Sequence, residues 1–506
     1  MFSMKRYLIL AFCVIYLTVN LEAQAGVWQP SLGYKQIPIW PEVIPDSIPV
    51  PEPENYTATT QLIAGQPVIM VNNVSEPTMT VYSPRSPNTG VAVIVFPGGG
   101  YNCLAIDLEG TEICDWLISN GITAILLKYR VPTPKVGRYW ESTKALEDAQ
   151  RTVGLVRFNA DKWHINPYKI GVLGFSAGGH LVTAISTRYH KRLYTVMDAA
   201  DNESCRPDFA LALYPGHLWH HDTDFALNPN IAVTGNTPPT FIVQAEDDPV
   251  DNVNNSLVYY IALKDAGIPV EMHLYAEGGH AFGLRHTEHQ ITKWPELAQT
   301  WLQTIGMINQ NPEVNKLIKS LDDQDWHERS QAIEMLCGMG LNARAAIPSL
   351  IERLDDEEWQ VRYAAATALT RMKPVPEQAI SSLISALSDE EWQVRKSVAE
   401  AIAAIGTTSE TAVSALTKAL SDIEWQVRKP VAEALATSGP ISNPAIDALI
   451  KALSDEEWQV RNASAMTLST IGAPAINSIQ ALTICLNDPE EQVRNTAANA
   501  IEKINK

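Results

Sequence analysis

The sequence predicts two unlike halves: a doubly wound α/β domain with a mostly parallel sheet, followed by an all-α solenoid. Residues 26–310 alternate short β-branched and apolar runs with longer segments of helical periodicity, which is typical of a parallel sheet covered by helices on both faces. From about residue 311 this strand pattern stops. A 33-residue period begins there, with tryptophan in the same slot of consecutive units.

Composition and charge exclude several classes of protein. The chain has 506 residues, of which 46% are hydrophobic and 19% charged, so it is neither disordered nor fibrous. A formal net charge of −19 leaves no basic surplus to neutralise a phosphate backbone, so we expect no nucleic-acid partner. Beyond the N-terminal segment, no apolar run reaches the roughly 18 residues of a membrane span.

Residues 1–25 are expected to be a signal peptide and not part of the fold. Lys5 and Arg6 precede an apolar run from Tyr7 to Thr18, and Ala23-Gln24-Ala25 offers a small-x-small cleavage site. The apolar run is too short to span a bilayer, which disfavours the alternative of an uncleaved anchor. The sequence therefore predicts export, to a periplasm or out of the cell.

The strands and helices of the first half are expected at defined places. Residues 26–90 are a proline-rich, extended lead-in that ends in a strand near 78–82. The catalytic core is expected in 91–310, with strands at 91–96, 122–127, 169–173, 209–214, 240–245 and 270–275 and helices at 107–120, 141–159, 177–189 and 256–266. Continuous apolar runs are typical of parallel strands that are buried on both faces.

Gly174-Phe175-Ser176-Ala177-Gly178 matches the pattern G-x-S-x-G between a predicted strand and a predicted helix. This context predicts a nucleophile elbow, a strained turn that exposes a serine hydroxyl. The alternative is an ordinary glycine-rich turn around a buried serine. Ser176 is the candidate nucleophile, and it needs a base and an acid that orients the base.

The acid and the base are expected after later strands, in that order along the chain. Four acidic residues follow the strand at 240–245: Glu246, Asp247, Asp248 and Asp251. We choose Asp248 as the orienting acid, with Asp247 as the second choice. His280 follows the next strand and comes after two glycines, so it is the predicted base.

A glycine triplet is placed to supply backbone N–H donors. It follows the strand that ends at Phe96, and glycines let backbone amides approach a developing negative charge. The predicted oxyanion hole combines the N–H groups of Gly99, Gly100 and Ala177.

No metal or organic cofactor is expected. Three histidines are interpreted as a loop that lines the cleft and not as a zinc site, because no cysteine or carboxylate lies at a familiar ligand spacing: His217, His220 and His221. His180, one helical turn after the serine, is expected to pack away from substrate. Cys103 and Cys114 are expected to be separate thiols in preference to a disulfide.

These motifs resemble the α/β-hydrolase superfamily and, within it, exported carbohydrate esterases of the acetylxylan and feruloyl esterase type. The matching stretches are 96–101, Glu109-Gly110, 116–117, 127–130, 174–180, 248–250 and 278–280. The resemblance implies the same roles for the residues singled out above, with no cofactor. Pro97 stands where many relatives have histidine, and the segment between Tyr214 and Thr240 is short, which predicts an open acyl pocket.

The period of the second half resembles about six short HEAT-like repeats over residues 311–506. One slot of each unit holds a tryptophan in the first five units: Trp326, Trp359, Trp392, Trp425 and Trp458. Glu491 occupies this slot in the last unit, as suits a capping repeat. Each unit has an acidic cluster at a predicted helix N-terminus, where negative charge is favoured. Each tryptophan either staples its own repeat or projects from an edge that binds sugar or a protein partner.

The sequence favours an exported serine esterase that removes acyl groups, above all acetyl, from a xylan-like polysaccharide. One alternative is a serine peptidase of the prolyl-oligopeptidase type, which shares the order serine, acid, histidine. The other is a binding scaffold in which the repeats act and the hydrolase has a minor role.

Overall fold

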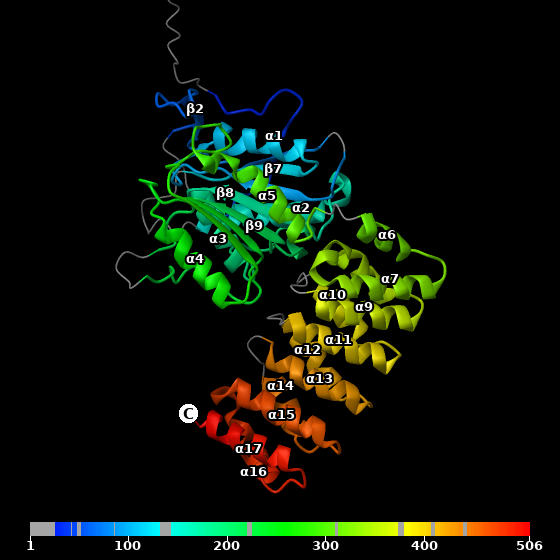
Figure 1. Cartoon of the computed structure of the whole chain (residues 1–506). Helices are drawn as coiled ribbons and strands as arrows, with labels where there is room; N and C mark the ends of the chain where they lie inside the picture. The colour runs from blue at the N-terminus through cyan, green and yellow to red at the C-terminus, as the bar shows by residue number, and fades with distance from the viewer. Residues whose placement is uncertain are drawn as a thin grey trace, which may run out of the picture.

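The computed structural model describes residues 26–41, 43–47, 52–84, 87–131, 143–219, 225–308, 312–372, 379–405, 410–438 and 443–505. The predicted signal peptide lies outside the described residues. The chain forms an α/β domain from which a row of helical pairs extends, ending in the C-terminal helix (Figure 1). The predicted fold class is confirmed.

An eight-stranded sheet forms the centre of the α/β domain, in the order β1-β4-β7-β5-β8-β9-β10-β11. The strands from β7 to β11 in this order run parallel, and β4 and β1 add an antiparallel edge. In sequence order the bounds are β1 Gln36–Pro38, β4 Thr78–Tyr82, β5 Ala92–Phe96, β7 Thr123–Lys128, β8 Ile170–Phe175, β9 Phe209–Leu213, β10 Thr240–Ala245 and β11 Val270–Tyr275.

The central strands are buried on both faces. Every residue of β5, β7, β8, β9 and β10 is buried, whereas the edge strand β11 is half-buried. This explains the continuous apolar runs in the sequence. A second sheet of three short strands was not predicted: β2 Asn55–Ala58, β3 Ile69–Asn72 and β6 Cys103–Ala105.

Helices cover the two faces of the large sheet. Right-handed crossovers place α1 (Glu112–Ser119), which follows β5 and precedes β7, on one face, and α2 (Thr143–Phe158), α3 (Ala177–Arg188) and α4 (Asn254–Asp265) on the other. Helix α5 (Trp294–Thr304) lies beside α1, because the rings of Trp116 and Trp294 are 5.3 Å apart between centroids. A π-helical turn over Asp107–Thr111 precedes α1, where the sequence predicted regular helix.

The second half is a stack of helical pairs with its own apolar core. The tryptophan helices pack against one another in sequence, and each begins at the residue in the tryptophan slot. Their bounds are α7 Trp326–Met339, α9 Trp359–Arg371, α11 Trp392–Ile405, α13 Trp425–Ala436, α15 Trp458–Ile471 and α17 Glu491–Ile504. The alternate helices are α6 Pro312–Ser320, α8 Ile347–Glu352, α10 Ala379–Ala386, α12 Glu410–Ala419, α14 Asn443–Ala452 and α16 Ile479–Cys485.

An arginine in each tryptophan helix except the last, α17, joins its repeat to the next one. Arg395 donates from Nε to Asp422 Oδ2 (2.6 Å) and from a terminal nitrogen to Asp422 Oδ1 (2.9 Å). Its other terminal nitrogen donates to the backbone carbonyls of Asp389 and Glu390. The same forked pair recurs at a spacing of 27 residues in Arg329–Asp356, Arg362–Asp389, Arg428–Asp455 and Arg461–Asp488. An aspartate of each later N-terminal acidic cluster therefore also binds the preceding repeat.

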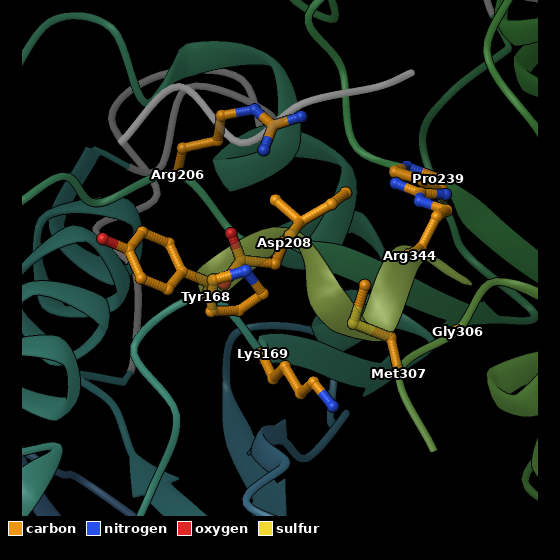
Figure 2. Close-up of a pocket in the computed structure, with 10 residues that line it drawn as sticks. Tyr168, Lys169, Arg206, Asp208, Pro239, Gly306, Met307 and Arg344 are labelled. Carbon is orange, nitrogen blue, oxygen red and sulfur yellow. The ribbon is translucent and has the colours of Figure 1, made fainter. Parts of the chain in front are cut away.

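The repeats attach at the N-terminal ends of the parallel strands. The side chain of Tyr168, just before β8, packs against the core of the repeats. A small pocket at the junction is lined from the α/β domain by residues that precede β8, β9 and β10, and from the repeats by Arg344, Ile347 and Pro348 (Figure 2). The residues that follow these strands lie at the opposite, C-terminal ends of the strands.

We expect Arg395→Ala to lower the free energy of unfolding by about 2 kcal/mol, because Asp422 and two carbonyl groups lose a charged donor. Thermal unfolding of the full chain, followed by circular dichroism at the helix band, measures the change. Lys396→Ala is the matched control, since its ion pair with Glu400 is exposed and should contribute at most about 0.5 kcal/mol. Equal stability of the two variants would contradict a structural role for the forked pairs.

Candidate active site

Ser176 occupies a strained turn between β8 and α3. Its φ of 52° and ψ of −118° lie in a region that side chains rarely adopt. The glycines on either side allow the turn to form: a Cβ on Gly174 would lie 2.2 Å from the carbonyl oxygen of Gly178, and a Cβ on Gly178 would lie 2.0 Å from that of Phe96. The turn has the geometry expected of a nucleophile elbow.

His280 lies between Ser176 and Asp248. Its Nε2 is 3.1 Å from Ser176 Oγ, and its Nδ1 is 2.8 Å from Asp248 Oδ2. Burial lowers the pKa of His280, but the hydrogen bond and charge of Asp248, together with the charge of Asp251, raise it to a value above that of free imidazole. The three side chains form one hydrogen-bonded chain.

The turn after β10 holds Asp248 in a single orientation. Its Oδ1 accepts hydrogen bonds from the N–H groups of Val250 (2.8 Å) and Asp251 (2.9 Å). The buried side chain of Gln244, in β10, donates to Oδ2 (3.2 Å) and to the carbonyl of Asp251 (3.1 Å). A carboxylate fixed in this way fixes the imidazole ring that it binds.

The competing acids after β10 have different surroundings. Glu246 and Asp247 are exposed, and Asp247 accepts a hydrogen bond from the N–H of Gly279 (2.8 Å), which anchors the loop that precedes His280. Asp248, the first choice from the sequence, is the one that reaches His280 Nδ1.

Asp251 lies beside the serine. Ser176 Oγ donates to its Oδ2 at 3.3 Å, and the same oxygen is 3.9 Å from His280 Nε2. Burial raises the pKa of Asp251 to about 6; the charge of His280 opposes this shift and that of Asp248 adds to it. The sequence placed Asp251 among four candidates for one role, whereas the structure brings two of those four to the site.

The glycine triplet forms the turn after β5. Gly99 has a φ of +127°, and a Cβ there would lie 2.2 Å from the carbonyl oxygen of Cys103, so only glycine fits. Among the described residues, the N–H groups of Gly99, Gly100 and Ala177 donate no backbone hydrogen bond. These N–H groups can therefore bind an anion.

A buried carboxylate that the sequence reasoning did not assign lies behind this turn. Glu109 accepts hydrogen bonds from the N–H of Gly98 (2.7 Å) and from the hydroxyl of Tyr214 (2.7 Å). Burial raises its pKa, and the hydrogen bond from Tyr214 opposes the shift. The ring of Tyr214 packs against His280, with centroids 4.8 Å apart. Glu109 therefore links the glycine turn to the histidine. Its presence in the Glu109-Gly110 motif was the only sequence signal.

The other histidines and cysteines that the sequence analysis named do not belong to the hydrogen-bonded chain from Ser176 to Asp248. His180 is buried, its Nδ1 is 2.8 Å from the hydroxyl of Tyr101, and burial lowers its pKa to about 3, so its ring is neutral. His217 lies near His180, while His220 and His221 are outside the described residues. In the described part of the chain, no group of three potential metal ligands is found, and Cys103 and Cys114 are unbridged.

Comparisons with known proteins match each half of the chain separately. Residues 79–214 match the BD-FAE family model, and residues 314–381, 347–436 and 413–502 match the model of HEAT repeats. The chain thus resembles the BD-FAE family of α/β-hydrolases in its first half and HEAT repeats in its second half. The predicted resemblance to carbohydrate esterases with a HEAT-like second half is confirmed.

Two curated relatives resemble part of this chain. An acetylxylan esterase of Xylanibacter ruminicola is 32% identical over 232 residues, which are 40% of this chain and 43% of the relative. An endo-1,4-beta-xylanase B of Butyrivibrio fibrisolvens is 31% identical over 225 residues, which are 39% of this chain and 33% of the relative. The chain thus spans less than half the length of either relative.

A solved structure also resembles part of this chain. It is an acetyl ester-xyloside bifunctional hydrolase of Caldicellulosiruptor lactoaceticus, with 32% sequence identity and a TM-score of 0.44. The match covers 54% of this chain and 97% of that chain.

The tryptophans of the HEAT repeats are half-buried. Four of them pack against the core of the repeats: Trp326, Trp359, Trp392 and Trp458. The first three also line an open groove of about 630 Å³ together with Tyr363. Four of the five rings therefore pack on the core of the repeats, and three of these four also face the groove. Among the described helices, none is long and apolar enough to cross a membrane.

We expect Glu109→Ala to lower the free energy of unfolding of the BD-FAE domain by about 2 kcal/mol, because a buried N–H and a buried hydroxyl lose their acceptor. Thermal unfolding measured by calorimetry tests this. Glu296→Ala, at an exposed position of α5, is the control and should change stability by at most about 0.5 kcal/mol. If both variants unfold alike, Glu109 does not support the glycine turn.

Proposed function

We propose that the chain is a serine esterase in which Ser176 is the nucleophile, His280 the general base and Asp248 the acid that orients the base. The observation on which the proposal rests is the continuous chain from Ser176 Oγ through His280 to Asp248, with distances of 3.1 and 2.8 Å. The strained backbone of Ser176 and the match to the BD-FAE model support it.

The reaction follows from these positions. Ser176 Oγ attacks the ester carbonyl carbon and its proton passes to His280 Nε2. The N–H groups of Gly99, Gly100 and Ala177 bind the oxyanion of the tetrahedral intermediate. His280 then gives its proton to the leaving alcohol, and water hydrolyses the acyl-enzyme with His280 again as base. No step requires a metal or organic cofactor.

Acetylated, xylan-like polysaccharide is the proposed substrate. The names of the relatives support this choice, since one is an acetylxylan esterase and the other a xylanase. The repeats attach at the edge of the sheet opposite the serine, so they leave the site open to a large substrate. A prolyl-oligopeptidase-like peptidase is less well supported, because neither of the two curated relatives reported above is named as a peptidase.

We also propose that the protein is exported, on the basis of residues 1–25 of the sequence. A binding role for the HEAT repeats is a second proposal. The groove beside Trp326, Trp359 and Trp392 supports it, because exposed faces of aromatic rings bind sugars and protein side chains. Such a role is compatible with the esterase, since the two sites lie on separate domains.

Replacing the nucleophile tests the proposed reaction. We expect Ser176→Ala to lower kcat on p-nitrophenyl acetate and on acetylated xylan by several orders of magnitude, on the order of 10⁶. Ser119→Ala, at the exposed end of α1, should retain full activity. Activity of the wild type on the small ester alone would keep the serine esterase and discard xylan. If the wild type cleaves neither ester, the repeats become the main functional part.

The pH dependence of kcat/KM tests the role of His280. The base must be neutral, and its pKa is raised, so activity should fall as the pH drops through a value above the ~6.5 of free imidazole. In Asp251→Asn the acid limb should move to lower pH, because a negative charge that favours the imidazolium is removed. An unchanged limb, or one that moves to higher pH, would contradict this assignment.

A further inference from the structure

Asp251 is a buried carboxylate that the proposed mechanism does not use. Its side chain is only 9% exposed, and among the described residues no lysine or arginine pairs with it. His280 Nε2 is 3.9 Å away, and burial raises the pKa of Asp251 despite the charge of that histidine, because a buried carboxylate without a close cation is costly. Such a group at the nucleophile needs a further explanation.

The position of Asp251 relates it to the alcohol part of an ester. The leaving oxygen must come within hydrogen-bond distance of His280 Nε2, because that atom protonates it. Asp251 Oδ2 is 3.9 Å from this nitrogen and 3.3 Å from Ser176 Oγ. The carboxylate therefore borders the place that the leaving oxygen occupies.

The backbone around Asp251 fixes the carboxylate at this place. Its N–H donates to Asp248 Oδ1, and its carbonyl accepts a hydrogen bond from Gln244. On the other side it packs against Gly216, where a Cβ would lie 2.4 Å from Asp251 Oδ1. The side chain is thus held against the nucleophile by two segments of the chain.

We propose that Asp251 recognises the alcohol part of the substrate by accepting a hydrogen bond from a hydroxyl group on the carbon next to the ester-bearing carbon. Sugars carry such a vicinal hydroxyl, whereas simple aryl and alkyl esters do not. Ser176 Oγ has a single proton, which passes to His280 in the proposed reaction, so the substrate hydroxyl supplies Asp251 with a second donor that remains. Hydrogen bonds to charged groups are among the stronger ones. Asp251 is then a specificity-determining residue, and this assignment rests on the proposed esterase function.

A site that is built to bind a hydroxyl discriminates strongly against an analogue that lacks it. The discriminating substrates are therefore a monoacetylated methyl xyloside with a free vicinal hydroxyl and its deoxy counterpart, in which hydrogen replaces that hydroxyl. We expect the wild type to prefer the hydroxylated ester in kcat/KM by about 10- to 100-fold.

The variant Asp251→Asn keeps the shape of the side chain and removes its charge. We expect it to lose about 10- to 100-fold in kcat/KM on the hydroxylated ester and to change less than about threefold on the deoxy ester, so that the preference disappears. Glu246→Gln, an exposed carboxylate of the same turn, should behave like the wild type.

Each outcome decides the assignment. An equal loss on both esters would show that Asp251 acts through His280 or Ser176, and would overturn the inference. Equal rates of the wild type on both esters would overturn it without any variant, which covers the case in which Asp251→Asn fails to fold. A wild type that hydrolyses neither these esters nor p-nitrophenyl acetate would instead refute the esterase function, and the inference with it.

Discussion

The site depends on the close contact of two backbone turns, those that follow β5 and β8. A Cβ on Gly98 would lie 2.7 Å from the carbonyl oxygen of Phe175, and one on Gly178 would lie 2.0 Å from that of Phe96. Because the two strands are adjacent and parallel, their turns meet at one edge of the sheet. Glycine at these positions lets the N–H groups of the proposed oxyanion hole lie beside the serine, and Glu109 accepts a hydrogen bond from the N–H of Gly98 behind the turn.

The central sheet could be predicted because its signal is local. A strand such as Ala92–Phe96 is buried on both faces, so its sequence is apolar throughout and its ends are visible. The second sheet has no such signal. Its pairs, for example Val71 with Leu104, join short half-buried segments that are distant in sequence, and their pairing depends on the tertiary fold.

The candidate site likewise contains residues that could be predicted from local sequence and contacts that could not. Ser176 and His280 stand in short motifs beside predicted strands, so their positions follow from the sequence. Which of several nearby acids binds the histidine depends on the course of one turn, and the structure puts Asp248 on Nδ1 and Asp251 near Nε2. The contact of Glu109 with Tyr214 joins residues 105 positions apart, which no local pattern encodes.

The two domains meet at the N-terminal ends of the parallel strands, whereas the serine follows the C-terminal end of β8. The length of the strands separates these two ends, so the junction at Tyr168 leaves the turns after β5 and β8 uncovered. The arginine–aspartate pairs join each repeat to the next, and the groove at Trp326, Trp359 and Trp392 lies on consecutive repeats that are joined in this way. The proposed polymeric substrate therefore reaches the serine without displacing the repeats. We therefore propose that the repeats contribute through binding, while the proposed reaction takes place at Ser176.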